Sequence, residues 1–194
     1  MDLYIKGVPP AATNRSTAKL MKTGQTTSYR TGDDGDLERG RNVDFTTLAE
    51  NNPFGNTNRF TDELGGQTYT KNIVIDWSTY DGSTVLGYRR TRGTGTWTQA
   101  IDGALAVSIS PFTSGWRLPN VRELINIMNY ELTSCTNYTP FSFAENLHSS
   151  TTWQSGTTNM LYTNSNGQAI VTTKTTSLFW IPCRTFTVTG TTLS

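Results

Sequence analysis

Apolar residues occur along this chain in short runs, and turn-forming residues bound each run. Ile73–Trp77 and Val85–Tyr88 have the length and the content of β-branched and aromatic residues that are typical of strands. Asp81-Gly82 lies between them as a turn signal. The pattern therefore predicts two neighbouring strands joined by a short turn.

A second β-rich region follows in the C-terminal part of the chain. The runs 160–162 and 168–171 flank Asn164–Gly167, and an Asn-Gly step between two such runs is a strong hairpin signal. The stretches 177–184 and 186–188 predict one or two final strands. The chain is thus expected to end in a region that is mainly β.

Helical periodicity appears between these two β regions. The first predicted helix covers residues 96–108, with Thr96 as an acceptable N-cap. Its inward face, at spacings of three and four, is predicted to consist of Trp97, Ile101, Ala104, Leu105 and Ser108.

The second predicted helix begins after Pro119 and extends to about residue 132. Asn120 is its N-cap and Glu123 stands at the third helical position, which is close to a capping box. We interpret its single apolar stripe as core packing rather than a cofactor site; the stripe consists of Val121, Leu124, Ile125, Met128 and Leu132.

Helices that are separate from a mostly antiparallel sheet define an α+β domain. We place this domain at residues 23–194, after an N-terminal arm at residues 1–22 that shows little periodicity. The arm is either a solvated tail or an extended segment that orders on a partner. The run Gly32–Asp36 predicts a tight acidic turn, because it does not match the ligand spacing of an EF-hand calcium loop.

Composition narrows the classes of partner. Sixteen Lys and Arg balance fifteen Asp and Glu, so the net charge of +1 gives no global electrostatic reason to expect nucleic acid. No apolar run approaches the roughly 20 residues of a membrane span, so we expect no membrane insertion. Thr supplies close to one residue in five, which disfavours a helical bundle. The N-terminal sequence lacks the pattern of a secretory signal, which predicts action where the chain is made or release by lysis.

The basic residues are distributed unevenly along the chain. Seven of the sixteen precede residue 42, whereas no acidic residue follows Glu145. The C-terminal β region therefore holds no pair of carboxylates for glycoside hydrolysis. The seven are Lys6, Arg15, Lys19, Lys22, Arg30, Arg39 and Arg41.

Few residues offer catalytic chemistry. The single histidine, His148, excludes a metal site with several histidines, and no third group is evident to orient it beside Ser149 and Ser150. We therefore predict a protein that is not an enzyme and that has no metal and no cofactor. Cys135 and Cys183 are either two free thiols or one disulfide, and their spacing does not decide between these.

The C-terminal β region is better suited to binding a ligand than to catalysis. Sugars bind flat apolar rings beside neutral hydrogen-bonding groups, and Trp153, Tyr162 and Trp180 lie among Thr, Asn, Ser and Gln. These three are candidate ligand contacts, with core packing as the competing interpretation of each. The basic cluster is a candidate contact for an anion or a sulfated glycan, with a solvated loop as its alternative; it consists of Arg89, Arg90 and Arg92.

Several motifs occur in a specific order. Arg59–Asp62 and Gly66–Trp77 precede Gly115–Leu124, which contains Trp-Arg-Leu-Pro followed by Glu-Leu; Ser149-Ser150-Thr151 and Cys183-Arg184 come later. In this order they resemble the Lcl C-terminal domain family, named for the Legionella collagen-like adhesin. The most specific motif residues are Trp116, Arg117, Leu118, Pro119 and Glu123. His148 and Pro182 depart from the family, which usually has Trp and Arg there.

The resemblance implies a C-type-lectin-like fold, with two helices, a twisted antiparallel sheet and chain ends that lie close together. The adhesin that names the family is trimeric and binds sulfated glycosaminoglycans, so the resemblance implies a homo-oligomer, with a trimer as the expected state. The related formylglycine-generating enzymes use cysteines and metal in this fold, and no matching site is evident here.

These observations lead to a hypothesis about function. We expect a bacteriophage virion surface protein of the tail, fibre or capsid-decoration type, assembled in the host cytoplasm. The arm would bind other virion proteins, and the domain would recognise a host-surface glycan or receptor. The alternative is an adhesin domain at the bacterial cell surface.

Overall fold

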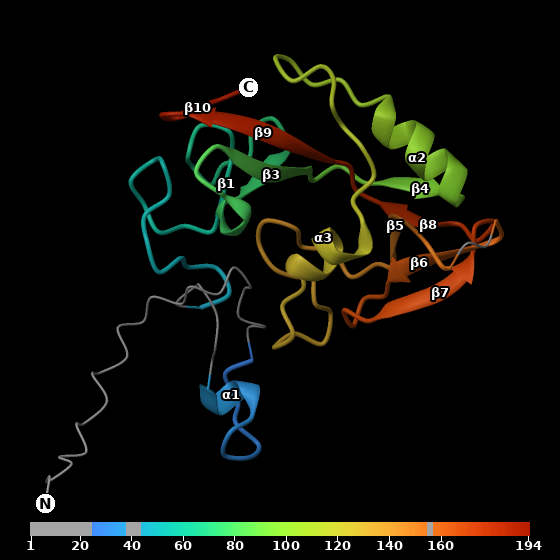
Figure 1. The fold of residues 1–194 in the computed structure, drawn as a ribbon, viewed down its shortest axis with the longest axis horizontal. Coiled ribbons are helices and arrows are strands. Elements are labelled where there is room, and N and C mark those ends of the chain that lie inside the picture. The colour runs from blue at the N-terminus through green and yellow to red at the C-terminus, as the bar shows by residue number, and fades with distance from the viewer. Residues whose placement is uncertain (1–24, 38–43, 155–156) are drawn as a thin grey trace, which may run out of the picture.

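The computed structural model describes residues 25–37, 44–154 and 157–194 (Figure 1). The predicted arm at residues 1–22 lies outside them. The helices are α1 (Asp34–Leu37), α2 (Trp97–Leu105) and α3 (Val121–Asn126), with a 3-10 turn at Trp77–Thr79. The strands are β1 (Phe60–Thr61), β2 (Ile73–Asp76), β3 (Thr84–Arg89), β4 (Gly93–Gly95), β5 (Leu147–Thr152), β6 (Asn159–Thr163), β7 (Ala169–Thr173), β8 (Leu178–Trp180), β9 (Cys183–Thr189) and β10 (Thr192–Leu193).

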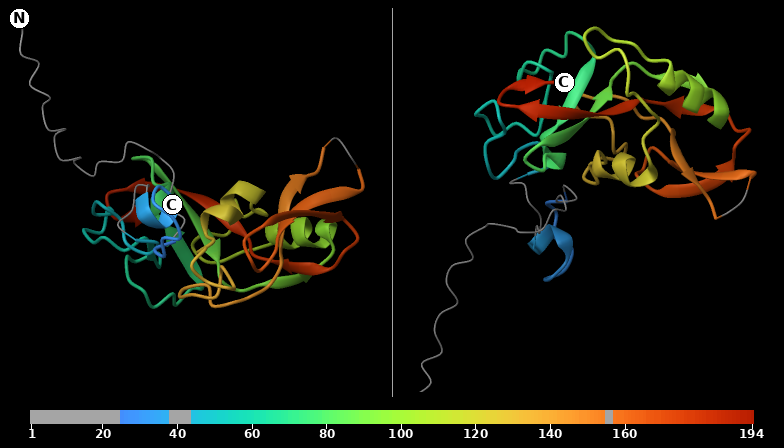
Figure 2. Two further views of the ribbon diagram at one scale, coloured as in Figure 1. Left: turned by 90° about the horizontal axis from the view of Figure 1, so that it is seen from below. Right: turned by 45° about the horizontal axis from the view of Figure 1, so that its top comes forward.

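The strands form two sheets, in the orders β1-β2-β3-β9-β10 and β4-β8-β5-β6-β7 (Figures 1 and 2). Pairing is antiparallel except between β5 and β8. This arrangement confirms the α+β class. The family resemblance implied one twisted antiparallel sheet, and the described strands instead divide between two.

Near its C-terminal end the chain passes from one sheet to the other at Ile181-Pro182. A continuous strand was predicted over 177–184, but β8 ends at Trp180 in one sheet and β9 begins at Cys183 in the other. Proline has no N–H for a strand ladder, and the carbonyl of Pro182 instead accepts from the Arg89 N–H at 2.9 Å. Of the one or two final strands that were predicted, the structure has two, and the interruption between them lies at 181–182.

The first sheet is buried on both faces, which explains the uninterrupted apolar run of β2. Val74 lies in a core cluster with Leu86, Tyr88 and Cys183. Its neighbours Ile73 and Ile75 lie in a second cluster. Successive side chains of a strand point to opposite faces, so each face of β2 contributes to a separate core. The second cluster also contains Trp77, Val85, Phe112, Trp116 and Phe186.

The predicted hairpin is confirmed by β6 and β7. Asn164 donates its N–H to Gln168 at 3.0 Å, and Gly167 has a φ of +78°, which glycine adopts without strain. The Asn-Gly signal thus identified both the turn and its position.

Both predicted helices exist, but each is shorter than its periodicity suggested. α2 ends at Leu105 rather than 108, and Leu105 is 63% exposed although it was assigned to the inward face. The face that packs contains Ala100 and Ala104, which contact Leu118, with Trp180 against the same cluster. Small residues of α2 therefore allow Trp180 to approach the helix, and Leu105 lies outside that contact.

α3 ends at Asn126, well before the predicted residue 132. Its start is as predicted, because Asn120 Oδ1 accepts from the N–H groups of Arg122 and Glu123. Its end is set by distant residues: the carbonyl of Asn126 accepts from Arg59 at 2.5 Å, and that of Ile127 accepts from the Tyr138 hydroxyl at 2.8 Å. The apolar pattern continued past the helix because Ile127 and Met128 are buried core residues.

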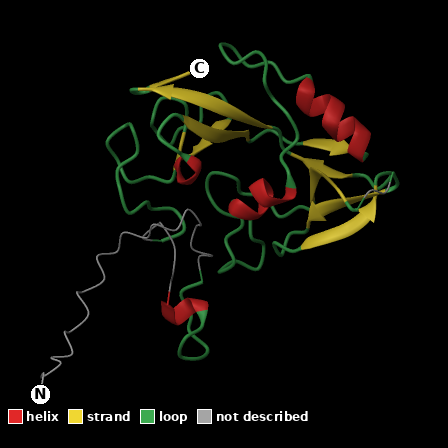
Figure 3. Ribbon diagram, viewed as in Figure 1, coloured by secondary structure: helices red, strands yellow, loops and turns green. Residues whose placement is uncertain are grey.

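The predicted tight turn covers only Gly32 and Asp33, and the rest of the acidic run, residues 34–36, is helical and lies in α1 (Figure 3). The Asp33 carboxylate accepts from the N–H groups of Tyr29, Arg30 and Asp36. These bonds hold the pKa of Asp33 below its usual value. The figures show α1 apart from both sheets.

Candidate functional site

Trp153 is the most open of the three predicted aromatic contacts. It follows β5 directly and is 42% exposed, while its backbone N–H donates to the Asn159 carbonyl of β6 at 3.2 Å. Thr152 and Gln154 on either side are also exposed, as are Thr157 and Thr158 across the loop. The backbone is thus anchored while the indole ring is presented among neutral hydrogen-bonding side chains.

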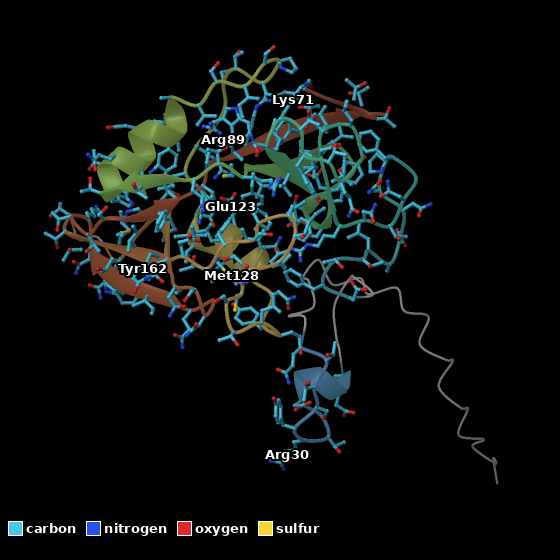
Figure 4. The ribbon with its side chains drawn as sticks, turned by 180° about the vertical axis from the view of Figure 1, so that it is seen from behind. Arg30, Lys71, Arg89, Glu123, Met128 and Tyr162 are labelled. Atoms are coloured by element: carbon cyan, nitrogen blue, oxygen red, sulfur yellow. The ribbon has the colours of Figure 1, made fainter. Side chains whose placement is uncertain are left out.

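Tyr162 lies on β6 opposite His148, and it is half-buried (Figure 4). Since Leu147 of β5 pairs with Phe179 of β8, His148 and Trp180 project to one face of the sheet. Trp180, His148 and Tyr162 therefore follow one another across three strands. α2 contacts β4, β5 and β8, which covers the Trp180 end of this row.

Trp180 is a packing residue rather than an open platform. A Cβ added at Gly93 would lie 2.2 Å from its ring, and one at Gly103 of α2 would lie 2.5 Å from it. Its indole N–H is buried without a hydrogen-bond partner in the described part of the chain. The competing interpretation, core packing, therefore holds for Trp180, and the three aromatic residues do not form one exposed surface.

Two of the three predicted arginine contacts are used within the fold. Arg90 donates to the Pro140 carbonyl at 2.6 Å, and its guanidinium carbon lies 5.1 Å from the centre of the Tyr69 ring. Arg92 pairs with Glu145. The guanidinium of Arg92 also lies over two rings, those of Phe143 and Phe179. Arg89 is half-buried and has no side-chain partner among the described residues. The cluster in sequence is therefore not one free cationic patch in space.

Arg184 belongs to one of the motifs of the family resemblance, but it was not predicted as a ligand contact. Its guanidinium carbon lies 5.2 Å and 4.8 Å from the ring centres of Phe112 and Phe186. Its Nη1 is buried without a partner in the described residues, and burial lowers the pKa of this guanidinium. Arg184 pairs with Gly87 of β3, so it shares a sheet face with Arg89. Only the pairing of β3 with β9 brings them to the same face.

The Trp-Arg-Leu-Pro motif joins β9 to α3. Arg117 donates from two nitrogens to the Glu123 carboxylate, at 2.8 and 2.6 Å. Its backbone exchanges both hydrogen bonds with Cys183 of β9, at 2.9 and 2.8 Å. Trp116 is buried and donates its indole N–H to the Phe112 carbonyl at 2.8 Å. Leu118 and Pro119 are buried as well. The motif thus has a structural role.

His148 and Ser149 do not form a catalytic pair. One imidazole nitrogen of His148 lies 2.8 Å from the Gly95 carbonyl, and the other lies 3.3 Å from the Met160 sulfur. The Ser149 hydroxyl donates to the Leu161 carbonyl at 2.6 Å, on the other side of the strand. Burial lowers the pKa of His148. Both side chains therefore serve the packing of the sheet.

Cys135 and Cys183 are two free, buried thiols, so the alternative of a disulfide is wrong for this structure. Cys183 lies against α3, with its sulfur 4.0 Å from Glu123 Oε2, and burial raises its pKa to about 12. Cys135 lies in the loop after α3, where its N–H donates to the Ser165 carbonyl. Hydrogen bonds and packing, rather than a covalent bond, hold each cysteine in place.

Over residues 25–37, 44–154 and 157–194, no group of three or more His, Cys, Asp and Glu side chains could hold a metal ion. None of the helices in the same ranges is long and apolar enough to cross a membrane.

Neither a protein-family model nor a curated protein matches this chain. The resemblance to the Lcl C-terminal domain family therefore stays a prediction. The candidate site rests on its own geometry, which is the open Trp153 ring beside exposed threonines and Gln154.

Proposed function

We propose that this chain is a non-enzymatic surface protein of a phage virion, whose C-type-lectin-like domain recognises a host-surface glycan. The observation that carries the glycan proposal is the loop between β5 and β6. In this loop Trp153 is 42% exposed, and the exposed residues beside it carry uncharged hydroxyl and amide groups. A sugar ring needs an apolar surface to stack on and neutral groups for its hydroxyls.

The roles of other reactive groups support recognition over catalysis. His148 contacts a carbonyl and a thioether, Cys183 is buried against Glu123, and Glu123 itself holds Arg117. A general acid or base has to reach a substrate proton, and these groups are instead bonded to or packed against other groups of the protein. His148 of β5 contacts Gly95 of β4 and Met160 of β6, and Arg117 connects Glu123 of α3 to Cys183 of β9.

The glycan proposal is tested on a glycan array with the full chain and with Trp153→Ala. We expect the variant not to bind the glycans that the wild-type chain binds on the array, because the stacking surface is removed. Tyr29→Ala is the matched control, since Tyr29 is 84% exposed but lies beside the acidic turn that precedes α1. Equal binding by Trp153→Ala and wild type, or no wild-type signal on any glycan, contradicts the proposal.

The virion location is a separate part of the proposal. It is supported by the segment 1–22, whose basic and aperiodic sequence suits an anchor that orders on a partner. Mass spectrometry of purified particles tests it directly, and we expect the chain in the particle. Deleting residues 1–22 should abolish incorporation while leaving the array result unchanged. Presence at a bacterial surface but in no particle would favour the adhesin alternative.

A further inference from the structure

β7 is an edge strand that has no charge, no proline and no bulge within its own five residues, and Lys174 follows it directly. It is the last strand of its sheet, and its register with β6 is uninterrupted from Asn159–Thr173 to Thr163–Ala169 (Figure 1). Its sequence, Ala-Ile-Val-Thr-Thr, contains no charge and no proline. Natural proteins place charges, prolines or bulges at such edges to prevent association.

The hydrogen bonds at both ends of the β6–β7 ladder show which backbone groups remain free. Asn164 donates to the Gln168 carbonyl, and Lys174 donates to the Thr158 carbonyl. In an antiparallel pair, residues alternate between those that bond to the partner and those that point away. Residues 168, 170, 172 and 174 therefore bond toward β6, and the N–H and C=O groups of Ala169 and Val171 point outward.

The side chains of the outward-pointing residues are exposed. Ala169, Val171 and Thr173 alternate with the half-buried Ile170 and Thr172, and Val171 is 39% exposed. The edge thus combines free backbone donors and acceptors with a neutral, partly apolar row of side chains. This combination is a template for strand addition.

We propose that β7 pairs antiparallel with β7 of a second copy of this chain, about a two-fold axis at Val171. In this register Val171 exchanges both backbone hydrogen bonds with its own copy. Ala169 lies opposite Thr173, whose carbonyl also accepts from the Thr176 N–H of its own chain at 3.1 Å. The outward-pointing residues of one strand then lie opposite those of the other, and no charged side chains of the two strands face each other. The second sheet becomes continuous across two copies. This inference does not depend on glycan binding.

The symmetry and the size of this contact define what should be measured. A two-fold strand pair uses the same patch on both copies and closes as a dimer, so it does not produce the trimer that the family resemblance implies. One short strand covers much less than the roughly 1,200 Å² of a standard interface, so the dimer is weak in solution. It becomes populated at high protein concentration or where copies are held close together.

Charge reversal at the two-fold axis tests the pairing. In sedimentation velocity, the average mass of the full chain should rise from 21.5 kDa toward twice that value as concentration increases. Val171→Lys and Val171→Glu should each remain monomeric, because like charges face each other across the axis. Their equimolar mixture should associate again, because the charges are then opposite. Thr187→Lys is the control, since β9 is paired on both sides and the added charge lies away from the edge.

Amide hydrogen exchange gives a second measurement that does not need a variant. In dilute solution the Val171 N–H should exchange rapidly, while those of Ile170 and Thr172 are protected by β6. At high concentration the Val171 N–H should become protected. Three outcomes would overturn the proposal. The first is an average mass that stays at the monomer value while Val171 exchange does not change with concentration. The others are a trimer, and association of Val171→Lys that is as strong as that of the wild type.

Discussion

Arg59 and Asp76 form an ion pair from which solvent is fully excluded. Nε and Nη2 of the guanidinium lie 2.9 and 3.0 Å from the two carboxylate oxygens. The rings of Phe45 and Phe60 pack on the same guanidinium, at 4.4 and 4.5 Å from its central carbon. Asn126 of α3 donates to the carboxylate and accepts from Arg59. One buried pair thereby connects β2, α3 and the segment that precedes β1.

Removing the charge of Asp76 should strongly destabilise the fold. In Asp76→Asn the guanidinium of Arg59 remains buried without a counter-charge, which we expect to cost about 3–5 kcal/mol of unfolding free energy. Urea denaturation followed by circular dichroism measures this cost. Asp102→Asn on the exposed surface of α2 makes the same change in net charge, and it should shift the free energy by less than about 0.5 kcal/mol. Equal effects of the two substitutions would contradict a role for the buried pair.

Gly103→Ala should destabilise the protein although alanine favours helix. In an isolated helix the change would stabilise by about 1 kcal/mol. Here the new methyl group would lie 2.5 Å from the Trp180 ring, so we expect a net loss of about 1–3 kcal/mol. Thermal unfolding measures the sign directly. Combining Gly103→Ala with Trp180→Leu should recover part of the loss, and additive effects would argue against the contact.

Stability should depend on the protonation of His148. Burial lowers its pKa in the fold, whereas the unfolded chain has the ordinary value of about 6.5. The unfolded state therefore binds the proton more readily, and the free energy of unfolding falls as the pH drops from about 6.5 toward the folded pKa. The contribution is complete above about pH 6.5.

Urea unfolding at pH 7.5 and 5.5 tests this dependence. His148 is the only histidine, so His148→Gln should show little change between the two values while wild type loses stability at pH 5.5. Because pH 5.5 is one unit below the unfolded pKa, the expected difference is at most about 1.4 kcal/mol. An equal pH dependence of the two proteins would rule out His148 as its source.

Both thiols should be unreactive in the native protein. Burial raises the pKa of Cys135, and it raises that of Cys183 to about 12, so the reactive thiolate is scarce at pH 8. We expect iodoacetamide to label neither residue natively and both in urea, as measured by mass spectrometry. A peptide pair linked through Cys135 and Cys183 in a non-reducing digest would contradict the free thiols.

Local patterns correctly predicted the elements whose signals lie within a few residues. The Asn166-Gly167 turn, the capping of α3 by Asn120 and the strand pair β2–β3 follow from short-range hydrogen bonding and side-chain alternation. The structural role of the Trp-Arg-Leu-Pro motif was also predictable, because Arg117 and Glu123 are close in sequence. The openness of Trp153 was predicted only as one of two alternatives.

The tertiary structure decided what depends on distant partners. α3 ends where Arg59 and Tyr138 donate to the carbonyls of Asn126 and Ile127, and these donors are 67 and 11 residues away in sequence. Trp180 is half-buried because two glycines, from β4 and α2, allow the chain to pack against its ring.

The sequence by itself determined an α+β chain with neutral, hydroxyl-rich strands and few groups for catalysis. It could not determine which side chains remain exposed, because exposure is set by what packs on a residue from elsewhere in the chain. The strand pairing and the helix placement decided which side chains are exposed. They half-bury Trp180 and engage Arg90 and Arg92 in contacts within the fold, and they leave Trp153 and the edge of β7 exposed.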